Sequence, residues 1–202
     1  MGFTRPYPFP YHNESNPPWD DEGFLYLKKL LKFILKSQND PHPPKCSYCR
    51  RYFGVDRDNI SIDIEHILPK EKYKEYTFFI ENLTLACKRC NMSIKGKRLD
   101  FLYLKRGDAK YNNFLDFDLN NYKFLHPNME NISDYIKYFN LETDDGCILF
   151  YQLTSLASSN PRAAFTYEFF RLNELQVDSR ENYQNNDKNS EVQDKYKIPN
   201  QL

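Results

Sequence analysis

The sequence lacks an excess of charge of either sign, and it also lacks any long hydrophobic run. Lys and Arg number 28, Asp and Glu number 28, and the formal net charge is zero. The chain is therefore no general polycation, and binding of nucleic acid would need a local basic patch or a partner subunit. Without a run of about 18 apolar residues, no transmembrane helix is expected.

Targeting signals are missing from the first residues as well. The stretch MGFTRPYPFPY has no apolar signal-peptide core, and Pro6 stands where a myristoylation motif needs Ser or Thr. We therefore expect a cytoplasmic protein with no membrane attachment.

Cysteine is scarce, but its placement is informative. Four of the five cysteines form the pairs CSYC, with Cys46 and Cys49, and CKRC, with Cys87 and Cys90. In a reducing compartment, two such pairs predict a tetrathiolate zinc site rather than disulfides. A redox role would need one pair and would leave the second unexplained. Cys147 lies in the apolar run GCILFY and is predicted to be a core residue.

Composition and pattern divide the chain into four regions. Residues 1–20 form a proline-rich arm, and 21–107 hold a helix and the cysteine pairs. Residues 108–183 form a C-terminal α/β extension, and 184–202 form a polar, flexible tail. The expected fold class is α+β, with an N-terminal helix and a mainly helical C-terminal region on either side of the cysteine-bearing core.

The element order follows from local periodicity. Apolar residues at helical spacing predict a helix over 20–39. ISIDIEHI and NLTLA predict strands, and NMSIKGKRLDFLYLK predicts a helix with Gly96 as a weak point. Further on, NISDYIKYFN predicts a helix, CILFYQLT a strand, and SNPRAAFTYEFF a helix with Asn160 as N-cap and Pro161 at its first position.

One histidine has chemically suitable companions. His66 ends the first predicted strand beside Glu65, and an imidazole is a general base at neutral pH. Asn91 directly follows Cys90, and a carboxylate, an amide oxygen and waters suit Mg²⁺ or Mn²⁺. Asp63 lies three positions before the histidine, and Glu65 is the preferred ligand.

These residues occur in the order of a known motif. DIEHILPK, then ENLTLACKRCNMSIKGKR, with CSYC upstream, resembles the four-cysteine, zinc-bearing form of the HNH endonuclease family. The resemblance implies a ββα-metal core and hydrolysis of phosphodiester bonds in DNA to 5′-phosphate and 3′-hydroxyl products, with RNA left open. It departs from the common pattern in having Glu65 for Asp and Asn91 for His.

The resemblance also implies roles for individual residues. His66 would be the general base, Glu65 and Asn91 would bind the catalytic Mg²⁺ or Mn²⁺, and Asn82 would orient His66. Lys95, one turn beyond Asn91, would be placed to contact phosphate. The sequence around the second cysteine pair is basic, which a polyanionic substrate requires. The nucleic-acid contacts expected there are Lys88, Arg89, Lys97 and Arg98.

The C-terminal region shows a second, less specific resemblance. YKFLHPNMENISDYI, GCILFYQLT and FFRLNELQVDSR are similar to the extension of HNH proteins of Septu and retron antiphage defence systems. That resemblance implies an ABC-type ATPase as partner, with the arm and tail as partner-binding elements. The alternative is a zinc-ribbon module that binds nucleic acid or protein without catalysis.

Overall fold

Two small antiparallel sheets organise the chain. The structure is a computed structural model, and it describes residues 19, 22, 25–37, 44–53, 62–143 and 146–178. Apart from Trp19, the predicted arm lies outside the described residues, and so do the predicted tail and the side chain of Cys147. In the described part of the chain, no helix combines the length and apolar character needed to cross a membrane.

The first sheet confirms both strands predicted around the histidine. β1 (Ile62–His66) pairs with β2 (Leu83–Cys87) in antiparallel register, with Glu65 opposite Thr84 and His66 opposite Leu83. Between them the chain makes two 3-10 turns, η4 (Lys74–Tyr76) and η5 (Ile80–Asn82).

The helix after β2 differs from the expected one. Instead of an α-helix over 91–105, η6 (Arg89–Lys95) is a π-helix in which the Gly96 amide bonds to the Asn91 carbonyl at 2.7 Å. It ends at Gly96, whose φ of +47° and ψ of −130° suit glycine and not L side chains. The predicted weak point is therefore the end of the helix.

The C-terminal region is richer in strand than predicted. β3 (Ile136–Thr143) pairs with β4 (Gly146–Leu153), and β5 (Val177–Asp178) adds a short third strand. The strand prediction at β4 is confirmed, but the helix prediction over 131–140 is wrong. Aromatic residues pair across the two strands, as with Phe139 stacked on Phe150 at 4.6 Å, and this cross-strand pairing overrides the helical spacing.

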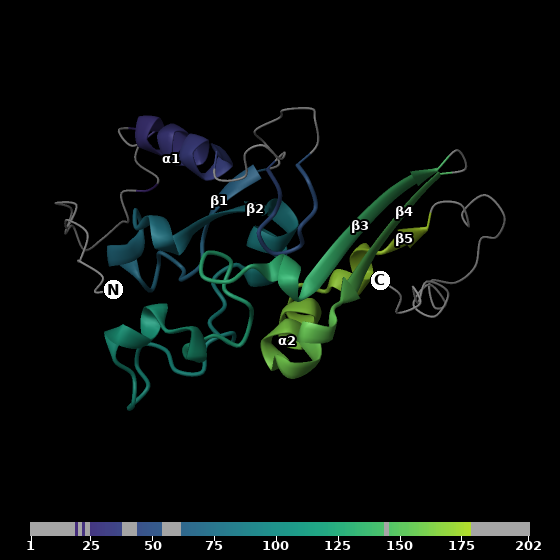
Figure 1. The fold of residues 1–202 in the computed structure, drawn as a ribbon. Coiled ribbons are helices and arrows are strands. Elements are labelled where there is room, and N and C mark those ends of the chain that lie inside the picture. Colours follow the sequence, from purple (N-terminus) through teal and green to yellow (C-terminus); the bar gives the residue numbers. More distant parts are fainter. Residues whose placement is uncertain are drawn as a thin grey trace.

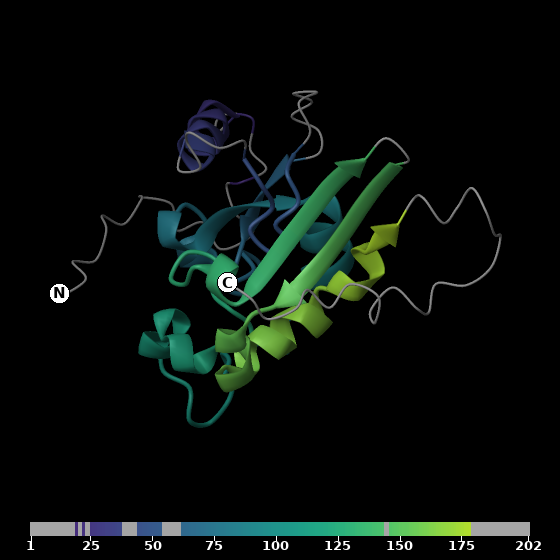
Figure 2. The same cartoon turned by 45° about the vertical axis from the view of Figure 1, so that its right-hand side comes forward.

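The two α-helices of the described residues lie on different parts of the structure. α1 (Leu25–Ser37) and the β3–β4 ribbon lie on opposite sides of β1 and β2 (Figure 1; Figure 2). α2 (Pro161–Phe169) begins as predicted, because the Asn160 side chain accepts the Arg162 amide. The remaining described 3-10 turns are η7 (Asn113–Phe117), η8 (Leu119–Asn121), η9 (Ile132–Asp134), η10 (Ser155–Ser159) and η11 (Leu172–Leu175).

Within the described residues, one hydrophobic core runs through both the cysteine-bearing region and the C-terminal extension. Tyr48, from the first cysteine turn, stacks on Phe170 at 4.2 Å between ring centroids, and Phe101 stacks on Phe124 at 4.5 Å. All four rings are buried. The C-terminal extension is therefore packed directly against the segment that holds the cysteines.

Candidate active site and metal centre

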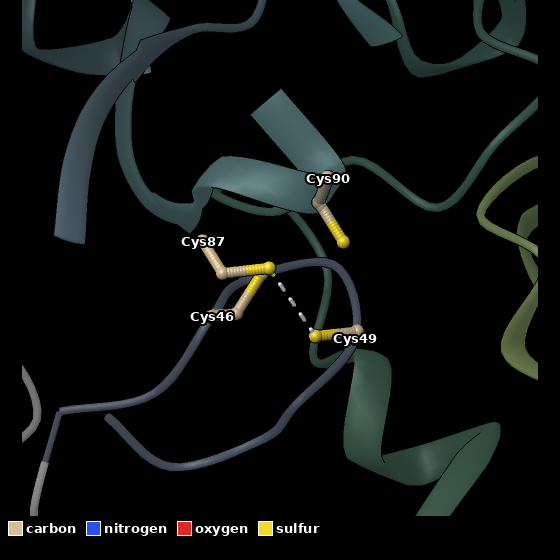
Figure 3. A group of neighbouring side chains, drawn as sticks. All are labelled: Cys46, Cys49, Cys87 and Cys90. Carbon is tan, nitrogen blue, oxygen red and sulfur yellow. Dashed lines mark hydrogen bonds between the residues drawn. The ribbon is translucent and has the colours of Figure 1, made fainter. Parts of the chain in front are cut away.

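The four paired cysteines meet in one cluster. The first pair lies on a turn before β1, and the second spans the end of β2 and the start of η6 (Figure 3). Their sulfur atoms all lie within 4.8 Å of one another, and the Sγ atoms of Cys49 and Cys87 are 3.9 Å apart. Tetrahedral zinc with Zn–S bonds of about 2.3 Å requires sulfurs about 3.8 Å apart. The cluster is therefore compatible with the predicted zinc site, whose four ligands are Cys46, Cys49, Cys87 and Cys90.

His66, at the end of β1, is held in one tautomer. Its Nε2–H donates to the Thr77 carbonyl at 2.9 Å, so Nδ1 is the basic nitrogen of the neutral ring. Trp19 packs edge-on against the ring at 4.6 Å, and only 8% of His66 is exposed. Burial lowers the pKa of His66 to about 4, although the bond to Thr77 raises it. The imidazole is therefore neutral at pH 7, which is the form a general base requires.

Asn82 fixes the chain immediately after His66. Its Oδ1 accepts the Leu68 amide at 2.7 Å, and its Nδ2 donates to the Leu68 carbonyl at 3.0 Å. The side chain is completely buried. Asn82 thus holds the turn that follows the histidine, and its role in orienting His66 stays a prediction.

Glu65 and Lys95 form a buried ion pair that the sequence did not indicate. The Lys95 ammonium is 2.5 Å from Glu65 Oε1 and donates to the His66 carbonyl at 2.8 Å. The Glu65 side chain is 4% exposed and the Lys95 side chain is 0% exposed. Burial raises the pKa of Glu65, whereas Lys95 lowers it. Lys95 therefore points into the protein, which differs from the predicted contact with phosphate.

The other carboxylate of β1 meets the predicted amide ligand. Asn91, on η6, donates from Nδ2 to Asp63 Oδ2 at 3.1 Å, and both side chains are partly exposed. The structure thus brings Asn91 to Asp63, whereas Glu65, the preferred ligand in the sequence, is held by Lys95. Asp63 and Glu65 are two positions apart on one strand and so share a face. This alternation along the strand was the sequence signal that could have indicated Asp63 as a neighbour of Asn91.

The predicted nucleic-acid contacts have different surroundings. Arg89 donates to the carbonyls of Phe170 and Arg171 and pairs with Glu174 at 3.2 Å, so it joins η6 to the C-terminal region. Arg98 pairs with Asp100 and lies over the Phe169 ring. Lys97 is 75% exposed beside Glu71, and Lys88 is exposed. Lys88, Lys97 and Arg98 are thus exposed, whereas Arg89 is partly buried against the C-terminal region.

Sequence reasoning missed three neighbours of the site. These are Trp19, which covers His66, the Thr77 carbonyl, which orients it, and Tyr48, whose pKa is raised by burial and by the charge of Glu65. They come from separate segments, so no local motif links them to the histidine.

Comparison with known proteins identifies the domain. A model of the HNH endonuclease family matches residues 46–97, which include both cysteine pairs, β1, β2 and η6. No curated protein and no solved structure matches the chain. The match and the cysteine cluster together fit a zinc-bearing HNH domain.

Proposed function

From the HNH domain over 46–97, we propose that the chain is a metal-dependent endonuclease that hydrolyses phosphodiester bonds in DNA. The products are 5′-phosphate and 3′-hydroxyl ends. The observation that carries the proposal is the setting of His66, whose Nε2–H is fixed on a carbonyl while oxygen ligands lie on the same strand and on η6.

His66 is the general base of this reaction. With Nε2–H donated to Thr77, Nδ1 is left to accept a proton from the attacking water. Asn82 keeps the following turn in place, so that the histidine stays at the end of β1. A neutral imidazole at pH 7 is ready to accept that proton.

The oxygen donors on β1 and η6 fit a hard divalent cation. Asp63 and Glu65 supply carboxylates and Asn91 supplies an amide, and this donor set suits Mg²⁺ or Mn²⁺. When bound, such an ion stabilises negative charge on the phosphate and on the departing 3′ oxygen. The four cysteines hold zinc separately, as a structural ion.

Plasmid cleavage with Mg²⁺ or Mn²⁺ tests the proposal. His66→Ala is expected to lower the cleavage rate about 100-fold or more, the usual contribution of a positioned base. Ser93→Ala, on the exposed face of η6, is the matched control and should cleave like the wild type. Zinc content and thermal unfolding verify that both variants are folded. Equal cleavage by His66→Ala and the wild type would overturn the proposed role of His66.

A non-catalytic zinc-ribbon module is the second candidate. Two observations favour it: Lys95 pairs with the predicted ligand Glu65, and Trp19 covers the histidine. This candidate predicts that the wild type binds DNA without cutting it, and that binding survives His66→Ala. Binding and cleavage measured on the same labelled duplex separate the two candidates.

The biological setting is a further part of the proposal. A role as effector nuclease of an antiphage system, with an ABC-type ATPase as partner in the cytoplasm, rests on the resemblance of the C-terminal region. Co-purification with the product of a neighbouring ATPase gene is the expected result. A monomeric, fully active chain with no such neighbour would count against it.

A further inference from the structure

Exposed apolar side chains are concentrated on α1. Of the twelve large apolar side chains that are exposed among the described residues, five belong to this helix of 13 residues. They are Leu25, Tyr26, Leu30, Phe33 and Ile34. Apolar residues scattered singly over a surface need no explanation, but a group of them on one element indicates a contact with another molecule.

Helix geometry separates most of these side chains from those that hold α1 to the domain. Leu31 and Leu35 are buried and mark the inward face. At 3.6 residues per turn, four exposed side chains form a second face about a third of a turn away. We call this face the outer stripe, and it consists of Tyr26, Leu30, Phe33 and Ile34. No described helix or strand covers the outer side of α1 (Figure 1; Figure 2).

The outer stripe has two large aromatic anchors. Tyr26 is 79% exposed and Phe33 is 69% exposed. Aromatic side chains bury about 150–250 Å² each, so these two offer on the order of 300 Å² of surface to a partner. Apolar side chains at i, i+4, i+7 and i+8 are the pattern through which one amphipathic helix meets another. The outer stripe therefore fits a second helix that lies along α1.

The charge of α1 specifies the polar edge of that second helix. The helix contains four lysines and no acidic residue; the lysines are Lys28, Lys29, Lys32 and Lys36. They fill the sector between the inward face and the outer stripe, and Lys29 is exposed one turn before Phe33. Burial lowers the pKa of Lys32, and the charge of Lys36 lowers it further, which shows repulsion within this row. Carboxylates along one edge of the partner would relieve that repulsion.

A second copy of this chain fits the outer stripe less well. If two α1 helices paired in antiparallel orientation about a two-fold axis, their lysine rows would lie on the same side and repel each other. The outer stripe is also smaller than the about 800 Å² that each partner buries in a standard interface. A weak contact with one helix of opposite charge is therefore favoured over a stable dimer.

We propose that the outer stripe binds an amphipathic helix of a partner protein, with apolar side chains at i, i+4 and i+7 and acidic residues along one edge. Tyr26 and Phe33 are the anchors, and Lys29 is the charged contact at the edge. The inference goes beyond the proposed function, because this binding requires no DNA, no catalytic metal and no cleavage.

Fluorescence anisotropy of a labelled model peptide, titrated with the zinc-loaded full chain, tests the proposal. The peptide is helical, with leucine at i, i+4 and i+7 and glutamate along one edge, and it should bind more tightly than a scrambled peptide of the same composition. The double variant Tyr26→Ala with Phe33→Ala is expected to weaken binding about 10-fold or more, as truncated anchors do. Phe114→Ala removes a ring that is 84% exposed on η7, and this matched control should bind like the wild type.

Exchange of charge tests the assigned edge. Lys29→Glu is expected to weaken binding of the acidic peptide about 3-fold and to strengthen binding of a peptide with lysine in place of glutamate. Lys110→Glu changes an exposed lysine outside α1 and makes the same change in net charge, so this control should bind both peptides like the wild type. Zinc content and thermal unfolding are measured on every variant. Unchanged affinities in Lys29→Glu would overturn the assigned edge.

Other results with the same proteins would overturn the proposal as a whole. Equal binding of the acidic and scrambled peptides, or unchanged binding by the double variant, would show that the outer stripe is not a helix-binding site. A wild-type dimer in sedimentation equilibrium that the double variant lacks would assign the stripe to a second copy. Pelleting with phosphatidylserine vesicles that the double variant loses would assign it to a membrane surface.

Discussion

Among the described lysines, Lys95 is the one that is buried. It lies completely buried, with its ammonium against Glu65, on the His66 carbonyl and 5.6 Å from the centre of the Phe101 ring. In such a pair, the attraction between the charges offsets a large desolvation cost. Removing one partner therefore destabilises the folded protein much more than removing both.

Lys95→Met is therefore expected to destabilise the zinc-loaded protein by about 3–5 kcal/mol, because Glu65 is left buried and unpaired. Adding Glu65→Gln should recover most of that loss. Urea unfolding of the two variants and the wild type measures the difference. A single variant no less stable than the double variant would show that the pair does not act as a buried unit.

Trp19 controls how far His66 is exposed. It is the single tryptophan of the chain, and its ring lies 4.6 Å from the His66 ring and 5.5 Å from that of Phe78. Trp19→Ala is expected to speed modification of His66 by diethylpyrocarbonate several-fold, since the reagent attacks exposed neutral imidazole. Peptide mass analysis locates the adduct.

A second aromatic truncation controls for general effects on the protein. Phe33→Ala removes a ring that is 69% exposed on α1, and it should leave the rate of His66 modification unchanged. Equal rates in Trp19→Ala and the wild type would mean that Trp19 does not shield the histidine.

At the scale of elements, the local pattern was reliable where it fitted one kind of secondary structure and not two. β1 was predictable because apolar and charged residues alternate along it, β2 because an apolar run leads into a cysteine pair, and α2 because Asn160 and Pro161 mark its start. β3 was missed because Ile132, Ile136 and Phe139 also fit a helical period. Pairing with β4 makes this segment a strand and not a helix.

In the candidate site, too, the sequence predicted some features and tertiary packing decided others. The sequence identified the cysteine cluster, because two C-x-x-C pairs predict four thiolates around one zinc ion, which places them together. It could not show that Lys95 turns inward to Glu65 or that Asn91 meets Asp63, since a lysine or amide takes whichever partner the fold brings near. Motif spacing gives proximity of segments, and tertiary packing decides which polar atoms meet.

The end of η6 depends on one glycine. Gly96 has φ +47° and ψ −130°, and a Cβ there would meet its nearest atom, the Met92 carbonyl oxygen, at an ordinary 3.5 Å. Gly96→Ala is therefore expected to cost about 1–3 kcal/mol through backbone strain and not through a clash. Ser93→Ala, on the same helix, should change stability by less than about 0.5 kcal/mol. Chemical denaturation compares them, and similar values for both would contradict the role of Gly96.

For the whole molecule, His126 makes stability depend on pH. It is completely buried against Tyr122, and burial, with a smaller effect of Arg162, lowers its pKa to about 3. Above pH 6.5 the ring is neutral in both the folded and unfolded states. As the pH falls below about 6.5, the unfolded chain binds a proton that the folded chain does not, so stability decreases down to about pH 3.

Between pH 7 and 5, His126 should account for about 2 kcal/mol of lost stability. His126→Gln keeps an acceptor for the Asn128 amide but does not titrate. Its unfolding free energy, measured in urea at constant ionic strength, should therefore fall about 2 kcal/mol less than that of the wild type over this range. Parallel decreases in the two proteins would show that other groups cause the effect.

Hydrogen bonds join the cysteine cluster of the HNH domain to the C-terminal extension. The Tyr151 hydroxyl on β4 donates to the Cys49 carbonyl at 2.7 Å, and Arg89, next to Cys90, donates to the Phe170 carbonyl at 2.8 Å. Structural zinc contributes about 10 kcal/mol or more in small zinc domains, which is similar to the whole stability of a typical domain. Zinc removal should therefore lower the stability of both the HNH domain and the C-terminal extension.

Hydrogen exchange followed by mass spectrometry measures this coupling. After zinc chelation, or in Cys87→Ser, amides of β1 and β2 are expected to lose protection, and those of β4 and α2 should lose it as well. The reason is that the contacts of Tyr151 and Arg89 end on the cysteine turns. Removal of Mg²⁺ or Mn²⁺ alone is the control and should leave both regions protected. Protection of β4 and α2 that persists without zinc would mean that the C-terminal extension folds independently of the HNH domain.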